Sequence, residues 1–174
     1  MALDPFLAET LAVLREQHAE MAKQITGLPA AALEWKPGPG TNSLAVLVLH
    51  CLGTERSWLS LAAAAAPLPR RNREAEFRAS GHDAATLLGM LQAADSAVEP
   101  LLGQVDPAKL GTPLDLGYTT VTGQRTVTPA WAIQHTVDHL GQHVGHMQLT
   151  RQLWDQGWGA RGSAACGEDH QPGA

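Results

Sequence analysis

The sequence predicts an all-α protein, a four-helix bundle with long crossover connections. Four segments repeat apolar residues at helical spacing, and clusters of Pro and Gly separate them. The chain shows no internal repeat and no succession of strands that would build a sheet. Helices of this length therefore bury their apolar faces against one another, which favours a bundle.

The first two helices have clear start and stop signals. The first is expected to open at Asp4-Pro5, an N-cap followed by proline at the first helical position, and to end before the stretch 27–29, which contains Gly and Pro. After the turn-rich stretch 36–40, the second should begin at residue 41, 42 or 43 and run to about Ala66, where prolines end it.

Two further helices are separated by an extended region. Asp83 caps the third helix, whose core positions lie between residues 87 and 102, and the fourth runs from Thr128-Pro129 to about Asp155. Between them, 116–127 is rich in β-branched residues around a glycine, so a short β-hairpin or an extended crossover is expected. A crossover spanning 106–127 would let the flanking helices run parallel.

Composition limits the organisation and the partners. With 174 residues, 44% of them hydrophobic, the chain is expected to form one domain over residues 1–157, followed by a Gly-rich tail over 158–174 that is expected to be disordered. The net charge of -5 comes from scattered acids, which argues against a nucleic-acid partner. No secretory signal or membrane-length apolar segment is found, so we expect a cytoplasmic protein with no membrane partner. Cys51 and Cys166 are expected to be free thiols, with Cys51 in the core.

A row of histidines in the fourth helix is the main functional signal. His135 and His139 are four residues apart, which stacks two imidazoles on one helix face. Gln142 and His146 share their narrow sector, which large apolar residues border, so these imidazoles need hydrogen-bond or metal partners. His50 lies in another helix, and three neutral imidazoles with an open position are typical of catalytic zinc sites. His146 is a reserve ligand or a group that hydrogen bonds a ligand.

Other histidines receive ordinary interpretations. His143 points toward the apolar stripe, which indicates a mostly structural role, and His18 takes a core position with satisfied partners. His82 and His170 lie in a loop and in the tail, where solvation is expected. A metalloprotease motif needs Glu after the first histidine, where Thr136 stands, and no histidine belongs to the Glu-x-x-His pairs of di-iron bundles.

The last-helix pattern resembles that of the DinB/YfiT-like superfamily, which includes bacterial DNA-damage-inducible proteins and metal-dependent thiol transferases. The resemblance is carried by His135, by the run His139-Leu-Gly-Gln142, and by His50 in an apolar stretch after a Gly-rich turn. It implies that His50, His135 and His139 hold one divalent ion, zinc or nickel, with water completing the site. Many relatives carry Arg where Leu140 stands, so that arginine's contribution is missing or supplied elsewhere.

The resemblance also implies an activity. Enzymatic relatives transfer or conjugate low-molecular-weight thiols such as bacillithiol or mycothiol, or isomerise a thiol adduct, so a metal-dependent thiol S-transferase acting on an electrophile is expected. No catalytic residue is assigned. Gln142 or His146 would orient substrate or bound water, and Glu55 would support a metal ligand. In the ordinary interpretation, Glu55 is a solvated charge and Gln142 a helix-packing amide.

Two alternatives stay open at this point. The first is a non-catalytic metal-binding bundle with a stress-response or structural role, and the second is a metal-dependent hydrolase that uses the bound water. Because the fourth helix is apolar over more than one face, a homodimer is expected.

Overall fold

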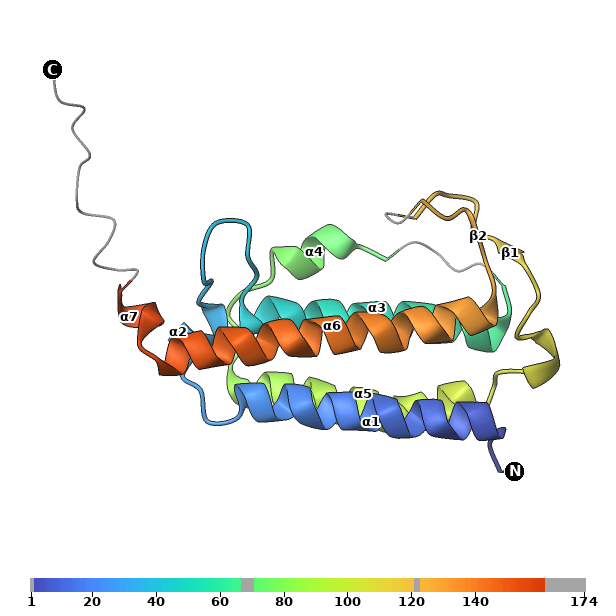
Figure 1. The fold of residues 1–174 in the computed structure, drawn as a ribbon, viewed down its shortest axis with the longest axis horizontal. Coiled ribbons are helices and arrows are strands. Elements are labelled where there is room, and N and C mark those ends of the chain that lie inside the picture. Colours follow the sequence, from blue (N-terminus) through green and yellow to red (C-terminus); the bar gives the residue numbers. More distant parts are fainter. Residues whose placement is uncertain (1, 67–70, 121–122, 162–174) are drawn as a thin grey trace, which may run out of the picture.

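Four long helices form the bundle in the computed structural model, which describes residues 2–66, 71–120 and 123–161. They are α1 (Pro5–Ile25), α3 (Leu44–Ala64), α5 (Ala84–Leu102) and α6 (Pro129–Asp155) (Figure 1). Each begins where the sequence predicts, because Asp4, Ser43, Asp83 and Thr128 each accept a backbone hydrogen bond as N-caps. The predicted all-α four-helix bundle is confirmed.

Short elements fill the connections. They are α2 (Ala30–Glu34), α4 (Arg73–Phe77), the 3-10 turn η1 (Pro107–Lys109), and strands β1 (Leu114–Asp115) and β2 (Thr126–Val127). A further short helix, α7 (Trp158–Arg161), follows α6. The strands pair antiparallel with Leu114 opposite Val127. Of the two structures expected for 116–127, the short hairpin is therefore the one observed, and its first strand begins two residues earlier. The helix α4 falls in a charged region without helical periodicity. Of the predicted tail, residues 158–161 are helical, and 162–174 lie outside the described residues.

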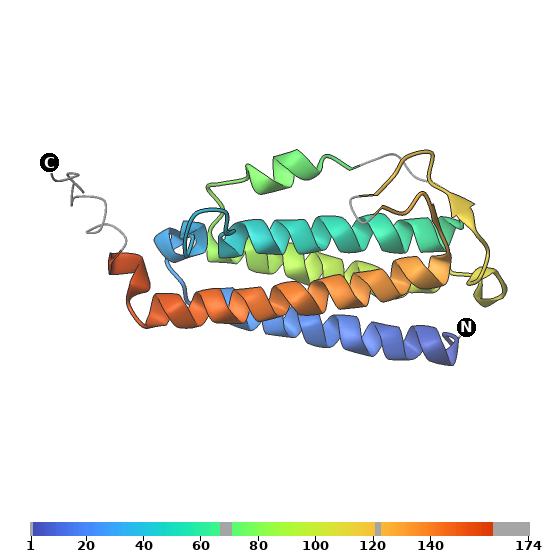
Figure 2. The ribbon, with the colours of Figure 1, turned by 45° about the horizontal axis from the view of Figure 1, so that its top comes forward.

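The four helices do not simply alternate in direction. Helices α1 and α6 run one way, while α3 and α5 run the other (Figures 1 and 2). Polar contacts agree, because Gln17 hydrogen bonds to Val137 and Gln148 to Glu20, so residue numbers rise together along α1 and α6. The connection carrying α4 therefore spans the bundle's length, and α3 and α5 are parallel neighbours.

The expectation that 106–127 allows its flanking helices to run parallel is wrong. Helices α5 and α6 run in opposite directions, because the connection between them begins and ends at the same end of the bundle (Figure 1). The lengthwise crossover is instead the connection between α3 and α5. Within this connection, α4 packs along α3, the helix that carries His50.

The core lies between the four helices. Its largest fully buried side chains come from every long helix and from α2, and they are Leu7, Leu14, Met21, Ile25, Leu33, Leu44, Leu59, Leu87, Leu102, Ile133, Leu140 and Met147. Cys51 is also fully buried, as expected, and burial raises the pKa of its thiol to about 12. Cys166 lies outside the described residues.

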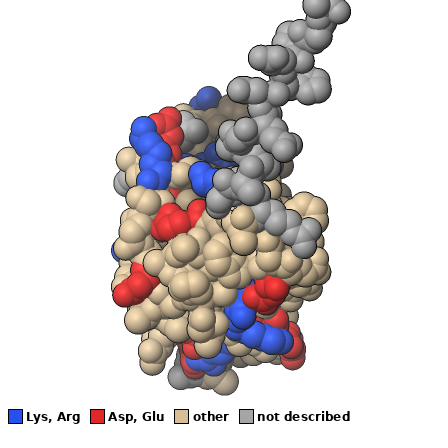
Figure 3. All heavy atoms as spheres, turned by 90° about the vertical axis from the view of Figure 1, so that its left-hand side faces the viewer, with Lys and Arg blue, Asp and Glu red and all other residues tan. Residues whose placement is uncertain are grey.

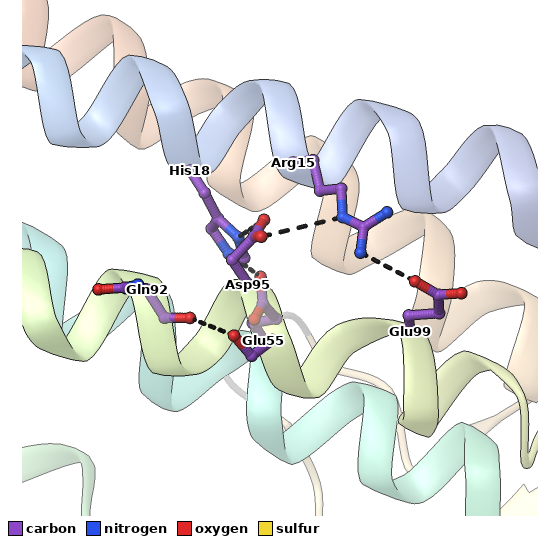
Figure 4. Close-up of polar contacts among 7 residues, drawn as sticks. Arg15, His18, Glu55, Gln92, Asp95 and Glu99 are labelled. Carbon is purple, nitrogen blue, oxygen red and sulfur yellow. Dashed lines mark hydrogen bonds and ion pairs between the residues drawn. The ribbon is translucent and has the colours of Figure 1, made fainter.

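One buried polar group crosses this core. His18 on α1 places Nε2 2.7 Å from the Glu55 carboxylate of α3 and Nδ1 3.3 Å from the Asp95 carboxylate of α5 (Figure 4). Arg15 extends the group outward by pairing with Glu99 at 2.9 Å. His18 is thus a core residue with satisfied partners, as the sequence indicates.

At the end of the bundle where α6 terminates, the described residues place charges of both signs on the surface. There, Lys and Arg are interspersed with Asp and Glu (Figure 3). Among the described residues, no helix combines the length and apolarity that crossing a bilayer requires.

Candidate metal centre

Three histidines from two helices form a compact cluster. His50 comes from α3, and His139 and His143 from α6, with one ring nitrogen of each lying within 4.8 Å of the others. The Nε2 atoms of His50 and His139 are 3.0 Å apart, and the ring centroids of His139 and His143 are 4.5 Å apart. Because α6 residues four apart share a face, both of its imidazoles meet the one that α3 presents.

His135 borders this cluster. Its ring centroid is 5.8 Å from that of His139. The ring stacks on Trp131, with centroids 4.6 Å apart and planes 8° apart, and meets the Trp58 ring edge-on at 5.5 Å. Two of the three sequence-predicted ligands, His50 and His139, therefore lie together with His143. His135, on the other side of His139 along α6, lies outside this group.

The remaining sequence-selected residues lie around the cluster or away from it. Gln142 is exposed and donates from Nε2 to Asp138 at 2.7 Å, while His146 is exposed with Nδ1 3.2 Å from Nδ1 of His143. Glu55 faces the opposite side of α3, where it pairs with His18. With 3% of its surface exposed, Glu55 is a buried partner of an imidazole, and its interpretation as a solvated charge is wrong.

Two loop and tail histidines were expected to be solvated. His82 is half-buried, and its Nδ1 is buried without a hydrogen-bond partner in the described part of the chain. His170 lies outside the described residues.

Glu76 is the site residue that sequence reasoning missed. Its Oε2 lies 3.0 Å from Nδ1 of His50, and its Oε1 lies 3.6 Å from Nε of Arg71. Gly53 of α3 makes room for it, because a Cβ at that position would collide with the Glu76 carboxylate. A carboxylate accepting from Nδ1–H leaves the lone pair of His50 on Nε2, the atom that faces His139.

The cluster imidazoles are held neutral. Burial lowers the pKa of His50 to about 3, assisted by the positive charge of Arg71 and of neighbouring groups. Burial likewise lowers the pKa of His139 to about 3, with the neighbouring histidines adding to the effect. The pKa values of His135 and His143 are also lowered, mainly by burial. At neutral pH, each ring therefore keeps one nitrogen unprotonated.

This donor set fits a divalent metal ion. Neutral imidazole nitrogens converging from two helices are ligands that zinc and similar ions take in proteins. In addition, Nδ1 of His139 is buried and has no hydrogen-bond partner within the described ranges. A cluster of facing ring nitrogens satisfies few hydrogen bonds internally, and a cation between them would engage their lone pairs.

The cluster opens into a cleft of about 480 Å³. His50, His135, His139 and His143 all line it. The other walls combine uncharged polar side chains and the acidic Asp138 with aromatic and cationic side chains. The aromatic and cationic ones are Trp58 of α3, Arg71 just before α4, Arg73 and Phe77 of α4, and Tyr118 from the segment between β1 and β2. The volume is suited to a small molecule.

The sequence match decides the family. A model of the mycothiol-S-transferase family matches residues 9–156, a span that contains all four cleft histidines and both connections that wall the cleft. The chain belongs to this family. None of the curated proteins compared with the chain matches it.

Solved structures support the same fold for this mycothiol-S-transferase family member. YfiT from Bacillus subtilis, described as a probable metal-dependent hydrolase with an unusual four-helix bundle topology, aligns with a TM-score of 0.69 at 16% identity, over 90% of this chain and 91% of YfiT. A DinB-like protein from Bacillus subtilis gives 0.60 at 16% identity, over 96% and 95% of the two chains. A mycothiol-dependent maleylpyruvate isomerase gives 0.61 at 14% identity, over 79% of this chain and 59% of the isomerase. The DinB/YfiT-like resemblance is confirmed.

Proposed function

We propose that this protein is a metal-dependent transferase that joins a low-molecular-weight thiol, of the mycothiol or bacillithiol type, to an electrophilic small molecule. The observation that carries the proposal is the cluster of neutral imidazoles at the floor of a cleft, in a chain of the mycothiol-S-transferase family. The partners are then small molecules, and we further propose that the protein acts in the cytoplasm as a homodimer.

His50 and His139 are the two proposed ligands that both lines of reasoning share. The third imidazole comes from His135 or from His143. The resemblance of the His135-to-Gln142 pattern to the DinB/YfiT-like superfamily supports His135, while the ring positions support His143, which already stands with the other two. His135 would first have to leave its stack on Trp131. Zinc and nickel are the proposed ions, because both accept imidazole nitrogen.

A divalent ion with an open position lowers the pKa of a bound thiol and so supplies thiolate near neutral pH. Residues of this chain would orient a metal ligand and limit the access of water to the thiolate. The Glu76 carboxylate accepts a hydrogen bond from Nδ1–H of His50, and this contact keeps the Nε2 atom of His50 directed at the cluster. Trp58 and Phe77 wall the cleft and limit the water that could protonate a thiolate. Gln142 lines the cleft and would orient a substrate. His146, exposed beside His143, is the other residue proposed for this role.

Metal content tests the site. Tag-free protein should carry close to one ion per chain by elemental analysis, and the ion should be lost in His50→Ala. Between His135→Ala and His143→Ala, the variant that removes the third ligand should lose the ion and the other should keep it. No ion in the wild-type protein, even after addition of zinc or nickel, would refute the metal site.

Turnover tests the reaction. The metal-loaded protein should consume mycothiol or bacillithiol in the presence of a reactive model electrophile, and His50→Ala should not. A loaded protein that accelerates no thiol conjugation across a panel of electrophiles would overturn the transferase proposal. If metal removal then lowered stability without any activity, a non-catalytic metal-binding bundle with a structural or stress-response role would take its place.

Hydrolysis is the second candidate, and similarity to a structure described as a probable metal-dependent hydrolase favours it. The same ligands would serve, with bound water in place of thiol. The discriminating measurement is ester or amide cleavage by the loaded protein without added thiol. Cleavage that does not depend on thiol would support the hydrolase.

A further inference from the structure

Arg73, at the start of α4, connects the rim of the cleft to the histidine cluster through an aromatic ring. Its guanidinium carbon lies 4.5 Å from the centroid of the Phe77 ring. The Phe77 ring in turn lies 4.7 Å, centroid to centroid, from the ring of His50. All three side chains line the same cleft. A cation therefore lies beside the proposed reaction centre, one aromatic ring away from a proposed metal ligand.

Arg71, a second arginine that lines this cleft, already contacts other residues of the protein. Its NH1 group donates to Thr54 Oγ1 at 2.6 Å, and its Nε lies 3.6 Å from Glu76 Oε1. These contacts join α4 to α3 and hold the carboxylate that orients His50. Arg71 thus stabilises the structure of the site, and its NH1 and Nε groups already have partners.

Arg73 differs, because its guanidinium makes no hydrogen bond or ion pair with any residue that the structure describes. The nearby acids have other partners: Glu74 pairs with Arg78 at 3.1 Å, and Glu76 pairs with His50 and Arg71. Stacking on an aromatic face uses the plane of a guanidinium and leaves its N–H edge free. That edge presents parallel donors, which match the two oxygens of a carboxylate.

Charge is distributed unevenly along the cleft. Burial lowers the pKa of His50 and of His143, and the charge of Arg73 adds to both shifts, so Arg73 acts on this end of the histidine row. The Asp138 carboxylate acts on His135 instead, where it opposes the effect of burial on the pKa. An anionic group would therefore be favoured at the Arg73 end and disfavoured at the Asp138 end.

We propose that Arg73 binds a carboxylate group of a substrate, so that the cleft selects small acidic molecules. The assignment of this carboxylate to a reacting molecule rests on the proposed transferase function, whereas its binding at Arg73 does not require turnover. The carboxylate is carried by the electrophile or by the thiol, and it anchors that molecule beside the histidine cluster.

Binding is tested on metal-free protein with succinate as the probe and its uncharged counterpart succinamide as the control ligand. The Nε–H resonance of Arg73 in isotope-labelled protein should shift and saturate with succinate and stay unchanged with succinamide. Arg73→Gln should weaken succinate binding by about tenfold or more, the loss expected for a charge-assisted hydrogen bond. Arg73→Lys keeps the positive charge but loses the parallel N–H donors of the guanidinium, so this variant should bind succinate with intermediate affinity.

Arg78→Gln is the matched control, because Arg78 follows the same helix, is exposed, and pairs with Glu74. It should bind succinate like the wild-type protein. Wild-type affinity in Arg73→Gln, or an equal loss in Arg78→Gln, would overturn the proposal.

The source of the carboxylate is then identified with metal-loaded protein and two matched pairs of reactants. One pair is an electrophilic acid and its methyl ester, and the other is 3-mercaptopropionate and its methyl ester. Arg73→Gln should raise KM for the acid of one pair, leave its ester unaffected, and leave kcat nearly unchanged. Equal effects on acid and ester in both pairs would refute carboxylate recognition. A protein that binds succinate through Arg73 but turns over no thiol would refute the transferase function alone.

Discussion

At the scale of single residues, the contact between Glu76 and His50 has the clearest functional consequence. A carboxylate that accepts from the outer nitrogen of a metal-binding histidine orients the ring and raises its basicity. We expect Glu76→Ala to lower metal affinity by about 10- to 100-fold, measured by competition with a chromophoric chelator. Glu74→Ala, which removes an exposed acid of the same helix, is the control. Unchanged affinity in Glu76→Ala would show that the contact does not support the site.

His18 should make stability depend on pH. Burial alone would lower its pKa, but hydrogen bonds and charge from Glu55 and Asp95 outweigh burial and raise the pKa above 6.5. Protonated His18 therefore stabilises the fold fully below about pH 6.5, the ordinary value, and this contribution is lost as pH rises through the raised pKa.

Urea unfolding of metal-free wild-type and His18→Gln protein, followed from pH 5.5 to 9, measures this contribution. The difference in unfolding free energy should be largest at the acidic end and shrink at alkaline pH. A difference that stays constant across this range would mean that His18 does not change its protonation on folding.

Residue-level prediction from the sequence succeeded where the signal was local. The spacing of His135 and His139 marks one face of a helix, and His50 stands out in an apolar run. The position of His143 could not be read in this way, because it depends on which part of the α6 surface meets α3. Glu76 could not be found either, since only tertiary packing brings it to a histidine that precedes it by 26 residues.

At the scale of elements, helix starts were predictable and helix directions were not. Capping involves neighbouring residues only, so Asp4, Ser43, Asp83 and Thr128 mark four N-termini correctly. Direction depends on the end of the bundle at which each connection returns, and no local pattern encodes that. Helix α4 was missed because five residues are too few to show helical periodicity.

The close approach of α3 and α4 gives an element-level prediction. Gly53→Ala should displace the Glu76 carboxylate and lower metal affinity in the same direction as Glu76→Ala. The double variant should be no weaker than Glu76→Ala alone, because both changes remove one contact. Chelator competition measures all three proteins.

Gly89→Ala in α5 is the control, since a Cβ there meets no atom of the described residues within 4 Å. Both alanines favour helix formation, so neither protein should unfold more easily for reasons of propensity. If Gly53→Ala binds metal with wild-type affinity, the Glu76 carboxylate can be displaced without a loss of metal affinity.

At the scale of the whole molecule, the oligomeric state stays a prediction. The inward stripe of α6, which includes Ile133, Leu140 and Met147, is buried within the single chain. Leu149 on the same helix is 55% exposed beside a small cavity lined by Leu47 and Leu153. If this surface mediates the proposed homodimer, Leu149→Glu should shift sedimentation velocity from dimer to monomer. A wild-type protein that sediments as a monomer at high concentration would refute the dimer.

The burial of Leu140 in the core explains why this chain does not carry the arginine that is common at this position of the DinB/YfiT-like pattern. The DinB/YfiT-like pattern often has Arg at this position, whereas here Leu140 is fully buried and packs in the core. A charge could not replace it without a partner. The cationic groups beside the cluster come instead from Arg71 and Arg73, at the connection that crosses the bundle.

The shared direction of α1 and α6 also determines how the molecule would respond to force. The chain enters α1 at one end of the bundle and leaves α6 at the other (Figure 1). Handles attached at Leu3 and Gln156 would therefore pull these two neighbouring helices in opposite directions along their common axis. Such a load shears the interface, so that its contacts resist together rather than opening one at a time. In an optical trap, the protein should rupture at higher force from these two points than from handles placed at the same end of α5 and α6.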